Sequence, residues 1–200
     1  MLRLRLFKSF GALVGALLIA SCADPALQGL TAPTESVASK GPGHGGENGS
    51  SVDLHALWWD KKQSHQVKVS QSVGPSGGTI SIPETGFTMV IPAGALSSTL
   101  NITVTADERY VAYKMEPTGT QFQQDVVVTQ LLTKTSLGGQ PLRDQIYAAY
   151  LADDNAKLSG KIPVAEIEPS TTIFSTLNPL IPQAQVWIIK HFSRYMLASG

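Results

Sequence analysis

From Val67 onward, apolar and polar residues alternate with a period of two, and this pattern constrains the fold more than any other feature. The alternation is clearest over residues 67–70, 79–82, 87–91 and 100–105. Successive side chains of a β-strand point to opposite faces of a sheet, so such segments are typical of half-buried strands. Clusters of glycine and proline separate them at residues 74–78, 83–86 and 92–94, where we expect turns.

The second half of the chain continues this pattern and contains no long amphipathic helix. Further strands are predicted near residues 109–115, 125–132, 145–152, 160–167, 171–175, 185–190 and 193–198. Short strands separated by frequent turn signals are typical of a β-sandwich or barrel. We therefore predict an all-β chain with an antiparallel β-sandwich, in which Ile80–Ile82 and Phe87–Ile91 form a hairpin around Pro83–Gly86.

The first 22 residues have the pattern of an export signal. Arg3, Arg5 and Lys8 precede an apolar run from Phe10 to Ala20. That run has roughly 11 residues, whereas a helix needs about 20 to span a bilayer, and no stop-transfer pattern follows. We expect residues 1–21 to be a signal peptide that is cleaved from the mature protein.

Cys22 is the only cysteine of the chain and follows directly after this signal. The sequence Ile19-Ala20-Ser21-Cys22 resembles the lipobox that lipoprotein signal peptidase recognises. The resemblance implies lipidation of Cys22 and an anchor in the cell membrane or outer membrane, with the chain facing the periplasm or exterior. One acyl chain gives only marginal membrane binding, so several chains are expected. The alternative is an ordinary secretory signal with a chance cysteine.

Residues 22–65 are predicted to be a disordered linker and residues 66–200 the folded domain. The stretch Gly41–Ser51 is nearly devoid of apolar side chains and cannot offset the entropy of ordering. Four apolar residues interrupt the polarity of the linker and are expected to pack onto the domain, with insertion into lipid headgroups as the alternative. They are Leu54, Leu57, Trp58 and Trp59.

The charge balance argues against nucleic acid as a partner. The signal contains three of the 15 basic residues, so the processed chain keeps 12 against 15 acidic residues. This is neither the basic footprint of a nucleic-acid-binding protein nor a polybasic membrane patch. The membrane is therefore expected to be a partner through the lipid anchor alone, with an envelope protein or a glycan as the further possibility.

Three motifs of the domain combine glycine and proline with apolar residues: Gly74-Pro75-Ser76-Gly77-Gly78, Ile91-Pro92-Ala93-Gly94-Ala95-Leu96 and Pro117-Thr118-Gly119-Thr120-Gln121-Phe122. Together they resemble the ZU-five domain, the module shared by zonula occludens proteins, ankyrins and netrin receptors. The match covers about residues 72–132 and departs at Asp125, where many relatives have proline. The resemblance implies an antiparallel β-sandwich that acts as a structural or interaction module. We expect Phe122 to anchor the strand that follows it in the core.

The tripeptide His191-Phe192-Ser193 is the sharpest chemical motif. Some relatives of the ZU-five domain cleave themselves between Phe and Ser in this sequence. The Ser193 hydroxyl would attack the Phe192 carbonyl, with His191 as base and with backbone strain at the scissile bond. The alternative is a purely structural element. It is either a strand in which His191 and Ser193 share a face with Tyr195 and Phe192 lies on the other face, or a turn or bulge in which His191 is hydrogen-bonded to a neighbouring backbone group.

No other constellation predicts an enzyme acting on other molecules, a cofactor or a metal. The histidines His44, His55, His65 and His191 are scattered, and Asp153-Asp154-Asn155 reads as a turn rather than a calcium loop. Tyrosines recur at a spacing of three, as Tyr110/Tyr113 and Tyr147/Tyr150, which places each pair on opposite faces of a strand. The leading interpretation is thus a lipid-anchored interaction module. The alternatives are a module that binds an extracellular glycan or peptide, and a self-cleaving domain.

Overall fold

The computed structural model describes residues 54–151, 153–159, 162 and 164–200. The predicted signal peptide, Cys22 and most of the predicted linker lie outside the described residues. The described part belongs to one compact unit, Asn48–Gly200, and contains twelve β-strands and one short 3₁₀ helix (η1, Leu132–Lys134). The prediction of an all-β fold is confirmed. None of the helical structure in this part of the chain is long and apolar enough to cross a membrane.

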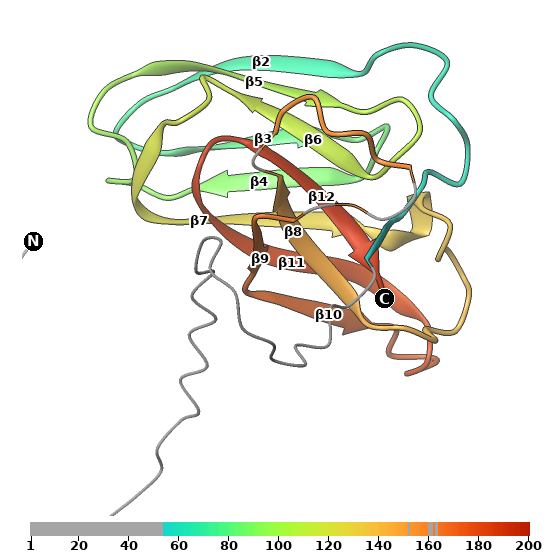
Figure 1. Cartoon of the computed structure of the whole chain (residues 1–200). Coiled ribbons are helices and arrows are strands. Elements are labelled where there is room, and N and C mark those ends of the chain that lie inside the picture. The colour runs from blue at the N-terminus through green and yellow to red at the C-terminus, as the bar shows by residue number, and fades with distance from the viewer. Residues whose placement is uncertain (1–53, 152, 160–161, 163) are drawn as a thin grey trace, which may run out of the picture. The chain divides into compact units, whose positions relative to one another are not determined.

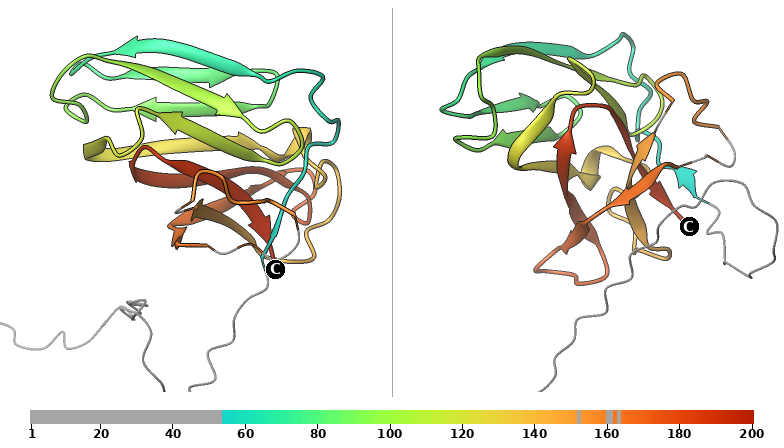
Figure 2. Two further views of the ribbon diagram at one scale, coloured as in Figure 1. Left: turned by 45° about the horizontal axis from the view of Figure 1, so that its top comes forward. Right: turned by 60° about the vertical axis from the view of Figure 1, so that its left-hand side comes forward.

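One of the two sheets has seven strands, all paired antiparallel. In spatial order its main path is β2 (Lys68–Val73), β5 (Leu100–Ala106), β6 (Ala112–Glu116), β12 (Arg194–Ser199), β8 (Ile146–Leu151) and β9 (Glu166–Glu168). The seventh strand, β1 (His55–Ala56), pairs with the end of β12. Figure 2 shows β1 (cyan) beside the C-terminus in the right-hand view.

The second sheet has five antiparallel strands. Their order is β10 (Ser170–Phe174), β11 (Pro182–His191), β7 (Gln121–Leu131), β4 (Phe87–Ile91) and β3 (Gly78–Ile82). Strands β3 and β4 form the predicted hairpin, with Ile82 opposite Phe87. Figure 1 shows the two sheets as the layers of a sandwich.

The main core lies between the sheets and is formed by the inward positions of the alternating strands. It includes the largest fully buried side chains, among them Trp187, Tyr113, Tyr195, Phe87 and Phe192. The aromatic ring of Phe122 packs edge-on against Phe192 at 4.7 Å, as its predicted anchoring role requires. Burial of these apolar side chains is the main stabilising contribution to such a fold.

A second, smaller core covers the outer face of the seven-stranded sheet. Strand β12 is buried on both faces, because Tyr195 and Leu197 enter the main core while Met196 and Ala198 enter the second one. The side chains of Leu54, Ala56, Leu158 and Ile162 cover this outer face. The tyrosine pairs follow the same division: Tyr113 and Tyr150 contact the main core, whereas Tyr110 and Tyr147 contact the second core.

The folded unit therefore begins before residue 66, the boundary expected from the sequence. The backbone N–H of Leu57 donates to Leu197, and the N–H of Val111 donates to the carbonyl of Leu57. Farther along, the N–H of Asp60 donates to Lys134. Residues 54–63 are thus joined by hydrogen bonds to parts of the chain that are far away in sequence. Except for Trp58, the apolar side chains of this segment are buried in the two cores, although polar residues follow them in the sequence.

Candidate functional site

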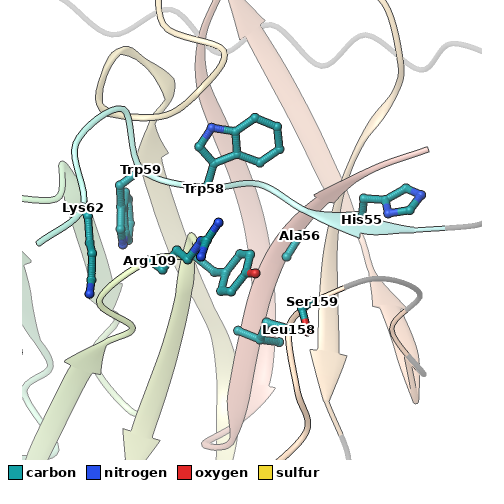
Figure 3. Close-up of a pocket in the computed structure, with 9 residues that line it drawn as sticks. His55, Ala56, Trp58, Trp59, Lys62, Arg109, Leu158 and Ser159 are labelled. Carbon is teal, nitrogen blue, oxygen red and sulfur yellow. The ribbon is translucent and has the colours of Figure 1, made fainter.

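A groove lies beside strand β1 (Figure 3). Its cavity has a volume of about 550 Å³. The lining residues are His55, Ala56, Trp58, Trp59, Lys62, Arg109, Tyr110, Leu158 and Ser159. We call this hollow the Trp58 groove. Its size falls in the range of ligand-binding clefts, and it combines an apolar floor with several hydrogen-bonding side chains.

The two adjacent tryptophans of the groove are positioned in opposite ways. The Trp59 side chain is 2 % exposed, and its indole Nε1 donates a hydrogen bond of 2.7 Å to the carbonyl of Asp107. The Trp58 side chain is 55 % exposed. Figure 3 shows the Trp58 indole above the backbone segment and Trp59 below it. The prediction that these apolar residues pack onto the domain is confirmed for Leu54, Leu57 and Trp59 and is wrong for Trp58.

The backbone geometry explains this division. Trp58 forms a β-bridge with Tyr110, and Trp59 forms one with Thr135, so the segment is locally extended. Neighbouring side chains of an extended segment point to opposite sides. One side faces the main core, where the edge of Trp59 packs against Tyr113 with ring centroids 6.0 Å apart. The next residue must therefore face outward, and the indole of Trp58 remains accessible to a ligand.

Two residues that line the groove, Arg109 and Tyr110, lie in the turn between β5 and β6. The carboxylate of Asp107 accepts hydrogen bonds of 2.8 Å from the backbone N–H groups of Arg109 and Tyr110, which closes the turn. The Arg109 guanidinium lies 5.7 Å from the centre of the Tyr110 ring, in cation–π range. This turn delays the start of β6 to Ala112, later than the predicted Arg109.

The loop at residues 153–159 forms another wall of the groove and is attached to the sheet by Arg194. The Arg194 guanidinium donates to the carbonyls of Asp154 at 2.7 Å and Ala156 at 2.9 Å, and it lies 3.8 Å from the Asp107 carboxylate. Within the loop, the Asp153 carboxylate accepts a hydrogen bond of 2.8 Å from the N–H of Asn155. Residues 153–155 thus form a turn.

The second candidate, His191-Phe192-Ser193, lies where the chain passes from one sheet to the other. Strand β11 ends at His191 and β12 begins at Arg194, and Figure 2 shows the tight red loop between them. Of the two structural interpretations of the tripeptide, the structure shows the turn or bulge and not one continuous strand. The register of β11 shifts between Ile189 and His191, and the crossing buries both Phe192 and Tyr195 completely instead of placing them on opposite faces of one strand.

Hydrogen bonds hold this crossing on both sides of the Phe192–Ser193 peptide bond. The Phe192 N–H donates to Thr120, the N–H of Gly119 donates to the Phe192 carbonyl, and the N–H of Met115 donates to the Ser193 carbonyl, each at 2.9 Å. The Gly119 N–H thus occupies the position where charge would develop on the carbonyl oxygen during attack by a nucleophile. The pattern equally suits a buried structural crossing.

The environment of His191 supports the structural interpretation of the crossing. Its Nδ1 atom lies 3.3 Å from the Tyr195 hydroxyl, which also donates to the His191 backbone carbonyl at 2.8 Å. Its ring packs edge-on against Tyr150 at 4.9 Å. The His191 imidazole therefore pairs with the Tyr195 hydroxyl and not with Ser193. The side chain of Ser193 is buried.

A carboxylate with an altered pKa lies near this crossing. Burial, together with the Glu166 carboxylate and against the opposing effect of Lys190, raises the pKa of Glu168 from 4.5 to about 7. Burial, followed by the nearby charge of Glu168, holds the pKa of the Tyr195 hydroxyl well above its usual value. Within the described part of the chain, no group of three or more His, Cys, Asp or Glu side chains is placed to hold a metal ion.

A scan against models of protein families found no match. A search of curated proteins found no matching sequence either.

The sequence did not predict the Trp58 groove. Its lining comes from three segments, near residues 55–62, 109–110 and 158–159, which only the fold brings together. One signal was present, because two consecutive tryptophans in an extended segment cannot both face the core. Cys22, the predicted lipidation site, lies outside the described residues.

Proposed function

We propose that this chain is a lipid-anchored protein of the cell envelope whose β-sandwich is an interaction module with a ZU-five-like architecture. The export signal and the Ile19-Ala20-Ser21-Cys22 motif support the anchor. The two-sheet fold agrees with the architecture that the sequence motifs imply. The binding surface of the module is the Trp58 groove, and the observation that carries this assignment is the 55 % exposed Trp58 indole at its rim.

The groove suits a glycan. Sugar rings have flat apolar faces that pack on an exposed indole, and their hydroxyls need hydrogen-bond partners around that platform. Arg109, His55 and Ser159 line the same hollow and supply such partners. A short extracellular peptide with an aromatic or proline side chain would meet the same requirements, and it is the alternative ligand.

Binding assays with a Trp58→Ala variant test the groove. The probes are insoluble peptidoglycan and soluble neutral oligosaccharides, and binding is measured by cosedimentation and by quenching of tryptophan fluorescence. We expect the substitution to weaken binding about tenfold or more, since an exposed aromatic anchor contributes most of the energy of such a contact. Leu177→Ala is the matched control, because Leu177 is 96 % exposed and does not line the groove. Equal binding by both variants would refute the assignment.

The intact mass of the protein extracted from its own membrane tests the anchor. A chain of residues 22–200 carrying acyl groups is the expected species, and an unlipidated chain would overturn the anchor. The same spectrum tests self-cleavage, because a lipidated fragment ending at Phe192 would reveal it. Ser193→Ala would abolish such a fragment, since only self-cleavage depends on that hydroxyl.

A further inference from the structure

The middle of the outer face of the five-stranded sheet consists of uncharged side chains, and the charged residues Asp125 and Lys190 lie at one end of it. Three rows of paired residues cross the sheet, and the alternation of each strand places them opposite the main core. The rows are Ile188–Val127–Val90–Thr79, Thr171–Val186–Thr129–Thr88–Ser81 and Ile173–Ala184–Leu131. We call these twelve residues the neutral face.

The neutral face is exposed, in contrast to the outer face of the other sheet. Val90, Val127, Leu131 and Ile173 are between 37 % and 49 % exposed. The seven-stranded sheet has its outer face covered by Leu54, Ala56, Leu158 and Ile162. No segment of the described chain forms a comparable apolar cover over the neutral face. Seven of the twelve side chains are apolar, and exposed apolar side chains gathered on one face are typical of an interaction site in a soluble domain.

We infer that the neutral face binds a second copy of this chain, in a face-to-face dimer. In a two-fold interface each copy presents the same patch, so a patch with charges of one sign would face the same charges on the second copy and be repelled. A face without charge avoids this repulsion, and β-branched side chains on a pleated surface pack well against a second sheet at about 10 Å. Exposed charged residues continue the strands outside the rows, with Lys190 on β11 and Asp125 on β7.

The area of the face indicates how strong this dimer is. Five strands about 4.8 Å apart, each contributing about five residues of 3.4 Å, cover roughly 400 Å² per copy. Two copies bury roughly 800 Å². A specific interface needs about 1,000 Å² or more, so we expect a weak dimer in solution. The proposed lipid anchor would confine copies to one surface and raise their effective concentration.

Sedimentation velocity over three decades of concentration tests the inference. The protein used is the chain without its first 21 residues and with Cys22→Ser, which retains every described strand. We expect a concentration-dependent shift from monomer to dimer. Val127→Lys and Thr129→Lys should each weaken the dimer about tenfold or more, because each places two like charges in one interface. Ser72→Lys, on the exposed surface of β2, is the matched control and should dimerise like the parent.

Cross-linking gives a second measurement that does not depend on a destabilising charge. Val127→Cys treated with a short bifunctional maleimide should give covalent dimers much faster than Ser72→Cys. A monomer at all concentrations, or equal cross-linking at both positions, would overturn the inference. It would also be overturned if Val127→Lys left the dimer intact, or if it removed binding to the glycan probes instead. Trp58→Ala should dimerise normally, so this inference and the groove can fail separately.

Discussion

A hydrogen-bonded pair in the core, Tyr113 and Gln130, links the two sheets and gives the sharpest test of how the sandwich is held together. The Tyr113 hydroxyl donates to the side-chain carbonyl of Gln130. The Gln130 amide donates in turn to the carbonyls of Thr85 at 2.6 Å and Leu131 at 2.9 Å. Gln130 is fully buried and Tyr113 is 1 % exposed, so water cannot replace a lost partner.

The cost of Tyr113→Phe therefore depends on whether Gln130 is present. In the parent chain the substitution leaves the buried Gln130 oxygen without its tyrosine donor, which costs about 1–3 kcal/mol of unfolding free energy. In a Gln130→Leu background the same substitution removes a hydroxyl that has already lost its acceptor. There it should be neutral or stabilising, so the coupling between the two residues is about 1–3 kcal/mol.

Urea unfolding of the four chains of this double-mutant cycle measures the coupling. Gln130→Leu alone should be the least stable chain, because it strands both the Tyr113 hydroxyl and the Thr85 carbonyl. Each kcal/mol also lowers the melting temperature by about 2–4 °C in a domain of this size. If Tyr113→Phe costs the same in both backgrounds, the two residues are not coupled and the inter-sheet hydrogen bond does not contribute to stability.

Three further predictions concern stability and can be checked by unfolding experiments. The parent chain should lose stability between about pH 4.5 and pH 7, because the protonated Glu168 carboxyl stabilises the fold and ionises over this range. Glu168→Gln should abolish this loss. A parent chain whose stability does not change over this range would contradict the prediction. Trp59→Ala should cost about 3–5 kcal/mol, whereas Trp58→Ala should cost under about 1 kcal/mol. Gly77→Ala should destabilise the fold more than Gly94→Ala. Both residues have positive φ, but only at Gly77 would the added Cβ meet backbone atoms of Ile91 and Pro92. Equal losses of unfolding free energy in the two variants would refute the clash.

Most strands were predictable because alternation records directly which side of a strand faces the core. The hairpin of Ile80–Ile82 and Phe87–Ile91 and the segments that became β5, β7 and β12 follow from this pattern alone. Alternation does not say which sheet a strand joins. The sequence predicts separate strands near residues 185–190 and 193–198, but the passage from one sheet to the other at Phe192–Ser193 is not visible in it.

The Trp58 groove and the second core were unpredictable for another physical reason. Strand β1 has only two residues, too few to show any period. The groups that bury Leu54 and Ala56 lie on β8 and β12, far along the chain. Burial there depends on a non-local assembly, and the surrounding polar residues 60–66 resemble a linker as strongly as the glycine-rich stretch before them does.

Residues 54–65, which include β1, consequently contribute to the main core, to the second core and to the Trp58 groove. Removing them tests whether the folded unit needs them. A chain that begins at residue 66 loses the cover of the second core, the Trp59 anchor of the main core and the Trp58 rim of the groove. Loss of a buried leucine or tryptophan costs about 2–5 kcal/mol each, and the removed segment contains Leu54, Leu57 and Trp59, so the sum approaches the whole stability of a typical domain. We expect this shortened chain to lack a cooperative thermal transition, whereas a chain that begins at residue 48 should retain one. If both chains melt at the same temperature, residues 54–65 are an appendage, and the groove that they line is not part of the folded module.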